Sequence, residues 1–484
     1  MKTEHKKKKW AAGILAVFGA AFLYLMGAAA PFLHYEEISE KTKETFQTAE
    51  FYSEETGPDR AMIMETNKSA WEERMRLFSQ AEDRIIMSTF DMRDGESTRD
   101  VLAVLYEKAE QGVDIKILVD GISGVIRMEG NELFYALSGH PNVEIKLYNR
   151  LNPFAPWKTQ GRMHDKYIIA DDLAYILGGR NQFDYFIGEY PTKNRSYDRE
   201  ILIYNTGAGS GSRESSLFQV EAYFEDMWSR EECTYFHEDA GLLEKEKEKV
   251  KAEILALEER YERLTAENPE LFEKSQDYAA RTKATNKVTL INNPTHIYGK
   301  EPVVFYKLME LAKEADSRVI FQTPYIVCNS YMLKELTELS EAVPDSRILI
   351  NSVENGDNFM ASSDYLYRKG EIVETGIPIY EYDGGLSNHG KSMVIDDDLA
   401  VIGSYNMDLR STYVDTELML AVHSEAIAGE LSGYMAAMEA DSRRVIGKTE
   451  YETPKHLTVE PVPWWKMAAM RVVGLLMQGV RGLV

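Results

Sequence analysis

The stretch "MHDKYIIAD" at residues 163–171 and the stretch "NHGKSMVID" at residues 388–396 carry the same pattern. In each, a lysine follows a histidine by two positions and an aspartate follows the lysine by five. The residues are His164, Lys166 and Asp171 in the first copy and His389, Lys391 and Asp396 in the second. Each motif runs on into a second apolar stretch, at 173–181 or 399–406, so both are predicted to be β-hairpins. The repeat indicates a duplicated domain.

The segments around the two motifs repeat the same order of strand, helix and strand. Strands are predicted over 83–90, 113–121 and 143–149 with a helix over 98–112, and over 317–327, 346–353 and 377–384 with a helix over 332–342. Such an order implies parallel strands joined by right-handed crossovers. The predicted fold class is therefore α/β, with two layered α/β/α domains.

The chain divides into six predicted segments. They are a basic end and apolar segment over 1–34, a linker over 35–59, a first half over 60–238, a helical insertion over 239–284, a second half over 285–445 and a tail over 446–484. Within the insertion, 241–274 has apolar residues at helical spacing, which favours a helix that packs on the body and ends at Pro269.

Alternation along a strand places the histidine and lysine of each motif on one face. The glycines at 178, 179 and 403, with Ser404, return opposite the histidine and are expected to leave room for a ligand. Asn181 and Asn406 follow them. Two ammonium groups and two amides suit the oxygens of a phosphodiester, while one imidazole attacks phosphorus and the other transfers protons.

Each of these histidines needs an acidic group at its second ring nitrogen to fix its tautomer. An Asp-x-Glu pattern follows each hairpin, so the candidates are Asp198, Glu200, Asp415 and Glu417. The two cysteines and the spacing of the histidines indicate no metal site, and no cofactor is predicted. The formal net charge of −24 argues against a nucleic-acid partner, because affinity for phosphate backbones comes largely from Lys and Arg.

Both ends of the chain carry membrane signals. Residues 10–33 contain no charge and follow a run of lysines, which predicts a transmembrane helix with the N-terminus in the cytoplasm and the body outside. A cleavable secretory signal is the alternative, and the body would then be secreted. Residues 463–484 have two tryptophans directly after Pro463 and contain three basic residues. This is typical of a helix at the membrane interface or of a helix docked on the protein's own core.

The doubled histidine, lysine and aspartate motif, with "GGRN" and "GSYN", resembles the phospholipase D superfamily and its HKD motif. "GRMHDKYIIADD" and "DTEL" are similar to the cardiolipin synthase branch, in particular its C type. The resemblance implies one active site shared by the two halves, without a metal, and a phosphohistidine formed on His164. His389 is then the general acid and base, Lys166, Lys391, Asn181 and Asn406 bind phosphate, and Asp171 and Asp396 are chiefly structural members of the catalytic motifs.

The implied function is a membrane-associated phosphatidyltransferase acting on phospholipids such as phosphatidylglycerol, phosphatidylethanolamine or cardiolipin. The alternatives are a phospholipase D hydrolase that releases phosphatidic acid and a phosphodiesterase or nuclease. Three positions depart from the branch: Asp165 replaces a basic or amide residue, Gly390 a small residue such as alanine, and Asp415 an asparagine. Asp165 is expected to face away from His164, because neighbouring residues of a strand alternate faces.

Overall fold

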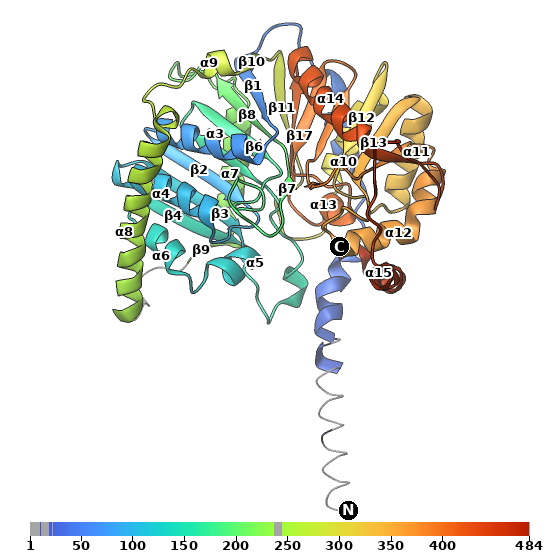
Figure 1. The fold of residues 1–484 in the computed structure, drawn as a ribbon, viewed down its shortest axis with the longest axis horizontal. Coiled ribbons are helices and arrows are strands. Elements are labelled where there is room, and N and C mark those ends of the chain that lie inside the picture. Colours follow the sequence, from blue (N-terminus) through green and yellow to red (C-terminus); the bar gives the residue numbers. More distant parts are fainter. Residues whose placement is uncertain (1–9, 11–18, 22, 237–243, 484) are drawn as a thin grey trace, which may run out of the picture.

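The computed structural model describes residues 10, 19–21, 23–236 and 244–483. Within them, two nine-stranded mixed sheets stand side by side, one in each half, and helices cover their faces (Figure 1). The predicted α/β class with two similar domains is confirmed.

The first sheet runs β10 (Lys283–Ala284), β1 (Asp59–Met64), β8 (Glu200–Asn205), β6 (Ala174–Gly178), β5 (Tyr167–Ala170), β2 (Arg84–Thr89), β3 (Asp114–Asp120), β4 (Val143–Tyr148) and β9 (Cys233–Tyr235). The second runs β11 (Lys287–Asn292), β18 (Leu418–His423), β17 (Leu399–Gly403), β16 (Ser392–Ile395), β12 (Arg318–Gln322), β13 (Asp345–Asn351), β14 (Ile379–Tyr382), β19 (Ser442–Val445) and β20 (Tyr451–Glu452). A small sheet joins β7 (Ser196–Tyr197) to β15 (Ser387–Asn388).

The predicted strand order is found in both halves. β2, β3 and β4 are parallel, as are β12, β13 and β14. The motif hairpins, β5 with β6 and β16 with β17, are antiparallel. The histidines and lysines themselves stand just before β5 and β16, at the ends of the strands rather than within them.

Three apolar clusters hold the layers together. Outer helices α3 (Asn67–Gln80), α4 (Glu96–Glu110) and α6 (Glu132–Ser138) cover the first sheet, and α10 (Val303–Lys313), α11 (Ser330–Ala342) and α12 (Phe359–Glu374) cover the second. Helices α7 (Leu217–Ser229) and α14 (Glu425–Ala440) lie in a third cluster to which both sheets contribute. The two halves therefore share a central apolar core.

The insertion forms α8 (Glu244–Glu267), which ends before Pro269 as predicted. Val250, Leu257 and Leu264 are buried against α4 and α6, so this helix packs on the body. Figure 1 shows it along the outer side of the first half. The sheets extend slightly beyond the predicted boundaries, because β10 lies inside the predicted insertion and β20 inside the predicted tail.

Residues 11–18 and 22 of the predicted transmembrane segment 10–33 lie outside the described residues, and its described part is helical at 10, 19–21 and 23–29. None of the helices in the described ranges is long and apolar enough to cross a membrane. At the other end, α15 (Trp464–Leu476) packs on α12 through Met470 and Gly474. The tail helix is thus docked on the body on one of its faces.

Candidate active site

The chain segments that precede the two hairpins cross to the opposite half. β15 pairs in parallel with β7, and the His389 N–H donates to the Tyr197 carbonyl at 2.6 Å. Met163 forms a parallel bridge with Thr416, whose carbonyl accepts from the His164 N–H at 3.3 Å. Each histidine therefore stands beside the acidic strand of the other half.

His164, from the first half, pairs with Glu417 from the second. Its Nδ1 lies 2.8 Å from Glu417 Oε1, and the carboxyl group is fully buried. The Ser411 hydroxyl donates to the same oxygen at 2.6 Å, and the Ser404 hydroxyl donates to Oε2. Glu417 is thus fixed on both oxygens and in turn fixes the imidazole.

His389, from the second half, pairs with Asp198 from the first. Its Nδ1 lies 2.7 Å from Asp198 Oδ2, and Lys391 Nζ lies 3.7 Å from the same oxygen. The other oxygen, Oδ1, accepts the N–H of Arg199 at 2.7 Å. The two halves are related by exchange, since each one supplies a carboxylate for the histidine of its neighbour.

An aromatic ring from the first half flanks each imidazole. The centroid of the Phe90 ring is 5.2 Å from that of His164, and that of Phe186 is 5.1 Å from that of His389. The imidazole side chains keep 12% and 13% of their surface exposed, so both are reachable from solvent but largely desolvated.

The two carboxyl groups differ in protonation. Burial raises the pKa of Glu417 to about 8, although Lys166 opposes the shift. Burial also disfavours the charged form of Asp198, but Lys391 and His389 outweigh it and lower its pKa to about 2. At neutral pH, Asp198 is an anion, whereas Glu417 holds a proton.

The two histidines also differ in how readily they take up a proton. Burial lowers the pKa of His164 well below its ordinary value, and Lys166 and Lys391 add to the shift. Burial and Lys391 also lower the pKa of His389, but the Asp198 carboxylate opposes them. His389 is therefore the ring that is easier to protonate, and His164 is the ring that stays neutral.

Both motif lysines are buried beside their histidines. Lys166 Nζ donates to the His164 carbonyl at 2.5 Å, and Lys391 Nζ donates to the His389 carbonyl at 2.5 Å. Burial lowers the pKa of Lys166 to about 7 and lowers that of Lys391 as well. An anion placed between them would favour the charged form of both ammonium groups, because an opposite charge favours the ionised form.

Asn181 and Asn406 are buried, and their Oδ1 atoms have no hydrogen-bond partner among the described residues. Buried amides are rarely left unpaired in a folded protein, so each such group calls for an explanation. Because Oδ1 accepts hydrogen bonds, the hydroxyl group of a ligand would pair with it, whereas a phosphate oxygen would need the amide N–H groups.

Asp171 and Asp396 lie at the far ends of the hairpins and do not contact the histidines. Asp171 accepts the backbone N–H groups of residues 82–84, and Asp396 accepts those of residues 316–318. Both adopt positive φ, at 49° and 51°, which aspartate tolerates in tight turns. Their inclusion among the catalytic residues is therefore corrected. Both shape the turns of the hairpins, in line with the chiefly structural role that the resemblance implies.

Two of the four candidates for orienting histidine have other partners. Glu200 accepts from Arg74 at 2.6 and 2.8 Å, and Asp415 accepts from Arg410 at 2.9 Å. Neither contacts a histidine, because Arg74 and Arg410 occupy their oxygens. In each Asp-x-Glu pair, one member serves the site and the other holds an arginine.

The prediction that the glycines of the hairpins leave room for a ligand is wrong. The space beside them is filled by other parts of the protein. A Cβ at Gly178 would lie 2.5 Å from the Arg199 carbonyl oxygen, and one at Gly403 would lie 2.1 Å from that of Leu418. A Cβ at Gly179 would lie 2.4 Å from Asp198 Oδ1. These residues allow the acidic strands to approach closely enough to reach the opposite histidines.

Several residues of the site lay beyond sequence reasoning. Ser411 and Thr416 are ordinary polar residues until the fold brings them to Glu417 and His164. Phe90 and Phe186 carried a weak signal, since Phe90 directly follows β2 and ligands gather at the carboxyl ends of parallel strands.

Asp165 faces away from His164, as expected. It is fully buried and accepts the Tyr223 hydroxyl at 2.7 Å and the Thr416 hydroxyl at 2.8 Å. Burial raises its pKa to about 7. It supports the bridge between Met163 and Thr416, and among the described residues it forms no ion pair with Lys166 or Lys391.

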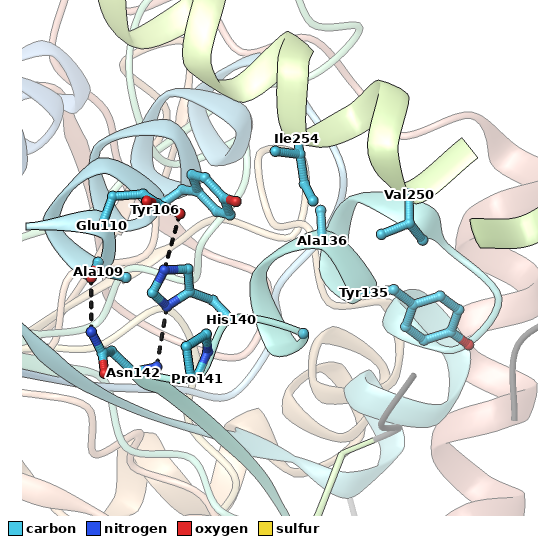
Figure 2. Close-up of a pocket in the computed structure, with 11 residues that line it drawn as sticks. Tyr106, Ala109, Glu110, Tyr135, Ala136, His140, Pro141, Asn142, Val250 and Ile254 are labelled. Carbon is cyan, nitrogen blue, oxygen red and sulfur yellow. Dashed lines mark hydrogen bonds and ion pairs between the residues drawn. The ribbon is translucent and has the colours of Figure 1, made fainter. Parts of the chain in front are cut away.

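A separate pocket of about 420 Å³ lies under α8 (Figure 2). His140 Nε2 lies 3.2 Å from Glu110 Oε1, and its Nδ1 accepts the Asn142 N–H at 3.1 Å. Both ring nitrogens are thus used within the fold, and none of the lining residues belongs to the crossed histidine pairs.

Paired domains with crossed histidine and carboxylate contacts and two buried lysines match the arrangement expected of an enzyme of the phospholipase D type. The family model described as "Cardiolipin synthase, PLD-like domain" matches residues 75–228 and 308–439, one stretch in each half and together more than half of the chain. The chain belongs to this family.

Known relatives extend over most of the chain. Cardiolipin synthase C of Escherichia coli K12 is 23% identical over 473 residues, which cover 85% of this chain and 94% of that protein. The major cardiolipin synthase ClsA of Bacillus subtilis 168 is 22% identical over 355 residues, or 73% and 63%. The crystal structure of phosphatidylserine synthase from Haemophilus influenzae Rd KW20 has the same fold, with a TM-score of 0.61, 16% identity, and coverage of 91% of this chain and 100% of that one.

We predict that Glu417→Gln changes how stability depends on pH. The folded-state pKa of Glu417 is raised from 4.5 to about 8, so between these values the folded state binds more protons than the unfolded state. The free energy of unfolding then falls as pH rises, by up to about 1.4 kcal/mol per pH unit for one proton. The wild type should lose stability relative to the Glu417→Gln variant between these pH values, measured as the difference in melting temperature. Parallel melting curves would contradict a protonated Glu417.

Proposed function

We propose that this protein transfers a phosphatidyl group from one phospholipid to the hydroxyl group of another, through a phosphohistidine on His164. The observation that carries the proposal is the unequal pair of crossed contacts. One imidazole is held neutral beside Glu417, and the other lies against the Asp198 anion, which stabilises its protonated form. The two rings therefore differ in basicity within one site, and His164 becomes the nucleophile when Glu417 gives up its proton.

In the first step, His164 Nε2 attacks phosphorus and the bond to the leaving alkoxide breaks. For Nε2 to be free, the ring proton must lie on Nδ1 and be donated to an ionised Glu417. His389 gives its proton to the departing alkoxide. In this proposal Lys166 and Lys391, with the amide N–H groups of Asn181 and Asn406, hold the nonbridging oxygens as negative charge builds up.

In the second step, His389 accepts a proton from the incoming hydroxyl group, whose oxygen attacks phosphorus. The bond between phosphorus and His164 Nε2 breaks, and both imidazoles return to their starting state. A lipid alcohol as acceptor completes transfer, whereas water completes hydrolysis to phosphatidic acid, the alternative function. The partition depends on which acceptor reaches the intermediate.

Phosphatidylglycerol and phosphatidylethanolamine are proposed as donors or acceptors, and cardiolipin as the product. The relatives named as cardiolipin synthases support cardiolipin as the product. We place the protein at the cell membrane, with the apolar segment 10–33 as a single anchor, the lysines before it in the cytoplasm and the body outside. Cleavage of that segment would make the body a secreted enzyme.

The reaction is tested with the full chain in vesicles of phosphatidylglycerol and phosphatidylethanolamine, with products followed by mass spectrometry. Cardiolipin is the expected product. Phosphatidic acid without cardiolipin would favour the hydrolase. Absence of both, together with cleavage of added DNA, would contradict action on lipids.

The roles of the two histidines are tested with a phosphatidyl ester of p-nitrophenol, a leaving group that departs without protonation. His389→Ala should still release one equivalent of p-nitrophenol and accumulate phosphoenzyme, whereas His164→Ala should release none. In His389→Ala, the rate of this burst should rise with pH up to about 8, as Glu417 loses its proton and accepts from His164 Nδ1–H. Phosphate trapped on His389 in the His164→Ala variant would reverse the assignment.

A further inference from the structure

The docked helix α15 leaves an apolar face uncovered. Trp464 and Trp465 are 83% and 61% exposed, and Leu475 and Leu476 are 58% and 75% exposed. These residues lie opposite Met470 and Gly474, which pack on α12. Exposed tryptophans and leucines on one helix face are unusual at a water-facing surface and typical of an interaction site.

A second uncovered apolar segment is the loop that follows β4. Phe154 is 88% exposed, Trp157 49% and Leu151 42%. The short helical turn Pro156–Lys158 contains no buried residue. The loop therefore presents bulky apolar side chains that the body does not cover.

The loop after β4 lies next to both the N-terminal helix and the C-terminal tail. A Cβ at Gly27 would lie 3.4 Å from the Pro156 side chain, so the N-terminal helix touches the loop. Arg410 donates to the Gln160 carbonyl at 2.8 Å and to the Leu483 carbonyl at 3.2 Å, which links the loop to the tail. In Figure 1, α15, the teal loop after β4 and the blue N-terminal helix all lie on the lower side of the molecule.

The charge of these segments opposes that of the rest of the chain. Residues 145–164 and 461–484 contain seven basic residues and no acidic one, in a chain of net charge −24. Arg162 and Arg481 are buried in ion pairs with Asp120 and Asp364, and Arg150 pairs with Glu129. Lys158, Lys466 and Arg471 form no ion pair among the described residues and are at least partly exposed, so they carry the positive charge of this surface. Residues 5–35 are free of acidic residues as well. Aromatic and aliphatic side chains interleaved with basic ones match the boundary of a bilayer that contains anionic lipid.

We infer that α15 and the loop 150–160 form one surface, the lipid-contact face, that rests on an anionic bilayer beside the N-terminal segment. The inference deepens the proposed function and rests on it, because an enzyme that acts on phospholipids needs a surface from which lipid reaches its active site. Arg410 also pairs with Asp415, two residues before Glu417, so the lipid-contact face is fixed relative to the His164 pair. Lipid entering from this face would approach the site without leaving the membrane surface.

The lipid-contact face is tested with an environment-sensitive fluorophore on a single introduced cysteine in the full chain. Both native cysteines are buried, so label goes to the introduced one. The test positions are F154C and L475C, and L255C on α8 is the control. Leu255 is as exposed as Leu475, at 59% and 58%, but α8 lies on the outer side of the first half. The protein is reconstituted in phosphatidylglycerol and phosphatidylcholine vesicles that carry a nitroxide on an acyl chain.

Quenching at 154 and 475 should exceed that at 255 by about threefold or more, because only probes that enter the bilayer come close to the nitroxide. Equal quenching at all three positions would overturn the inference. The readout needs no turnover, so quenching without product would remove the proposed function and leave the lipid-contact face in place. Product without quenching would remove the lipid-contact face and leave the proposed function in place.

A pair of variants provides a second measurement. Trp464→Ser with Trp465→Ser should lower turnover of vesicle lipid by about tenfold, since each apolar side chain that enters lipid adds to affinity. Turnover of the water-soluble bis(p-nitrophenyl) phosphate should be unchanged, which shows that the fold is intact. Leu255→Ser should leave both unchanged. Vesicle turnover that stays at the wild-type level in the double variant would contradict the inference.

Discussion

The exchange of carboxylates between the two halves is the constraint on which the rest of the structure depends. Asp198 of the first half holds His389, and Glu417 of the second half holds His164. Neither half could orient its own histidine, because its acidic residue points across the boundary. The shared apolar core, the bridges at Thr416 and Tyr197 and the close approach at the hairpin glycines all serve to bring these pairs into contact.

Burying so many charges is costly unless they are paired and hydrogen-bonded. The site meets this cost unequally, with an ionised Asp198 close to Lys391 and a protonated Glu417 held by two serine hydroxyls. The inequality gives two imidazoles from matching motifs different basicities.

Much of this arrangement could be predicted from the repeated motif. Local patterns predicted the hairpins, the parallel strands, the packed insertion helix and the pairing of each lysine with its histidine. The exchange could not be predicted, since whether Asp198 or Glu200 reaches a histidine depends on Arg74, which lies 126 residues from Glu200 in the chain. The glycines were misjudged for the same reason, because the neighbouring strand that fills the space beside Gly178 is a tertiary contact. The tail had two interpretations, and α15 combines a docked face with an uncovered one.

The most direct test of the exchange is the titration of the two histidines, followed by nitrogen-15 NMR of the imidazoles in the full chain. Asp198→Asn should lower the pKa of His389, which loses its neighbouring anion, and leave the tautomer of His164 unchanged. Glu417→Gln should alter the tautomer of His164 and leave His389 unchanged. If Asp198→Asn instead perturbed His164 and Glu417→Gln perturbed His389, each half would orient its own histidine, and the exchange would be wrong.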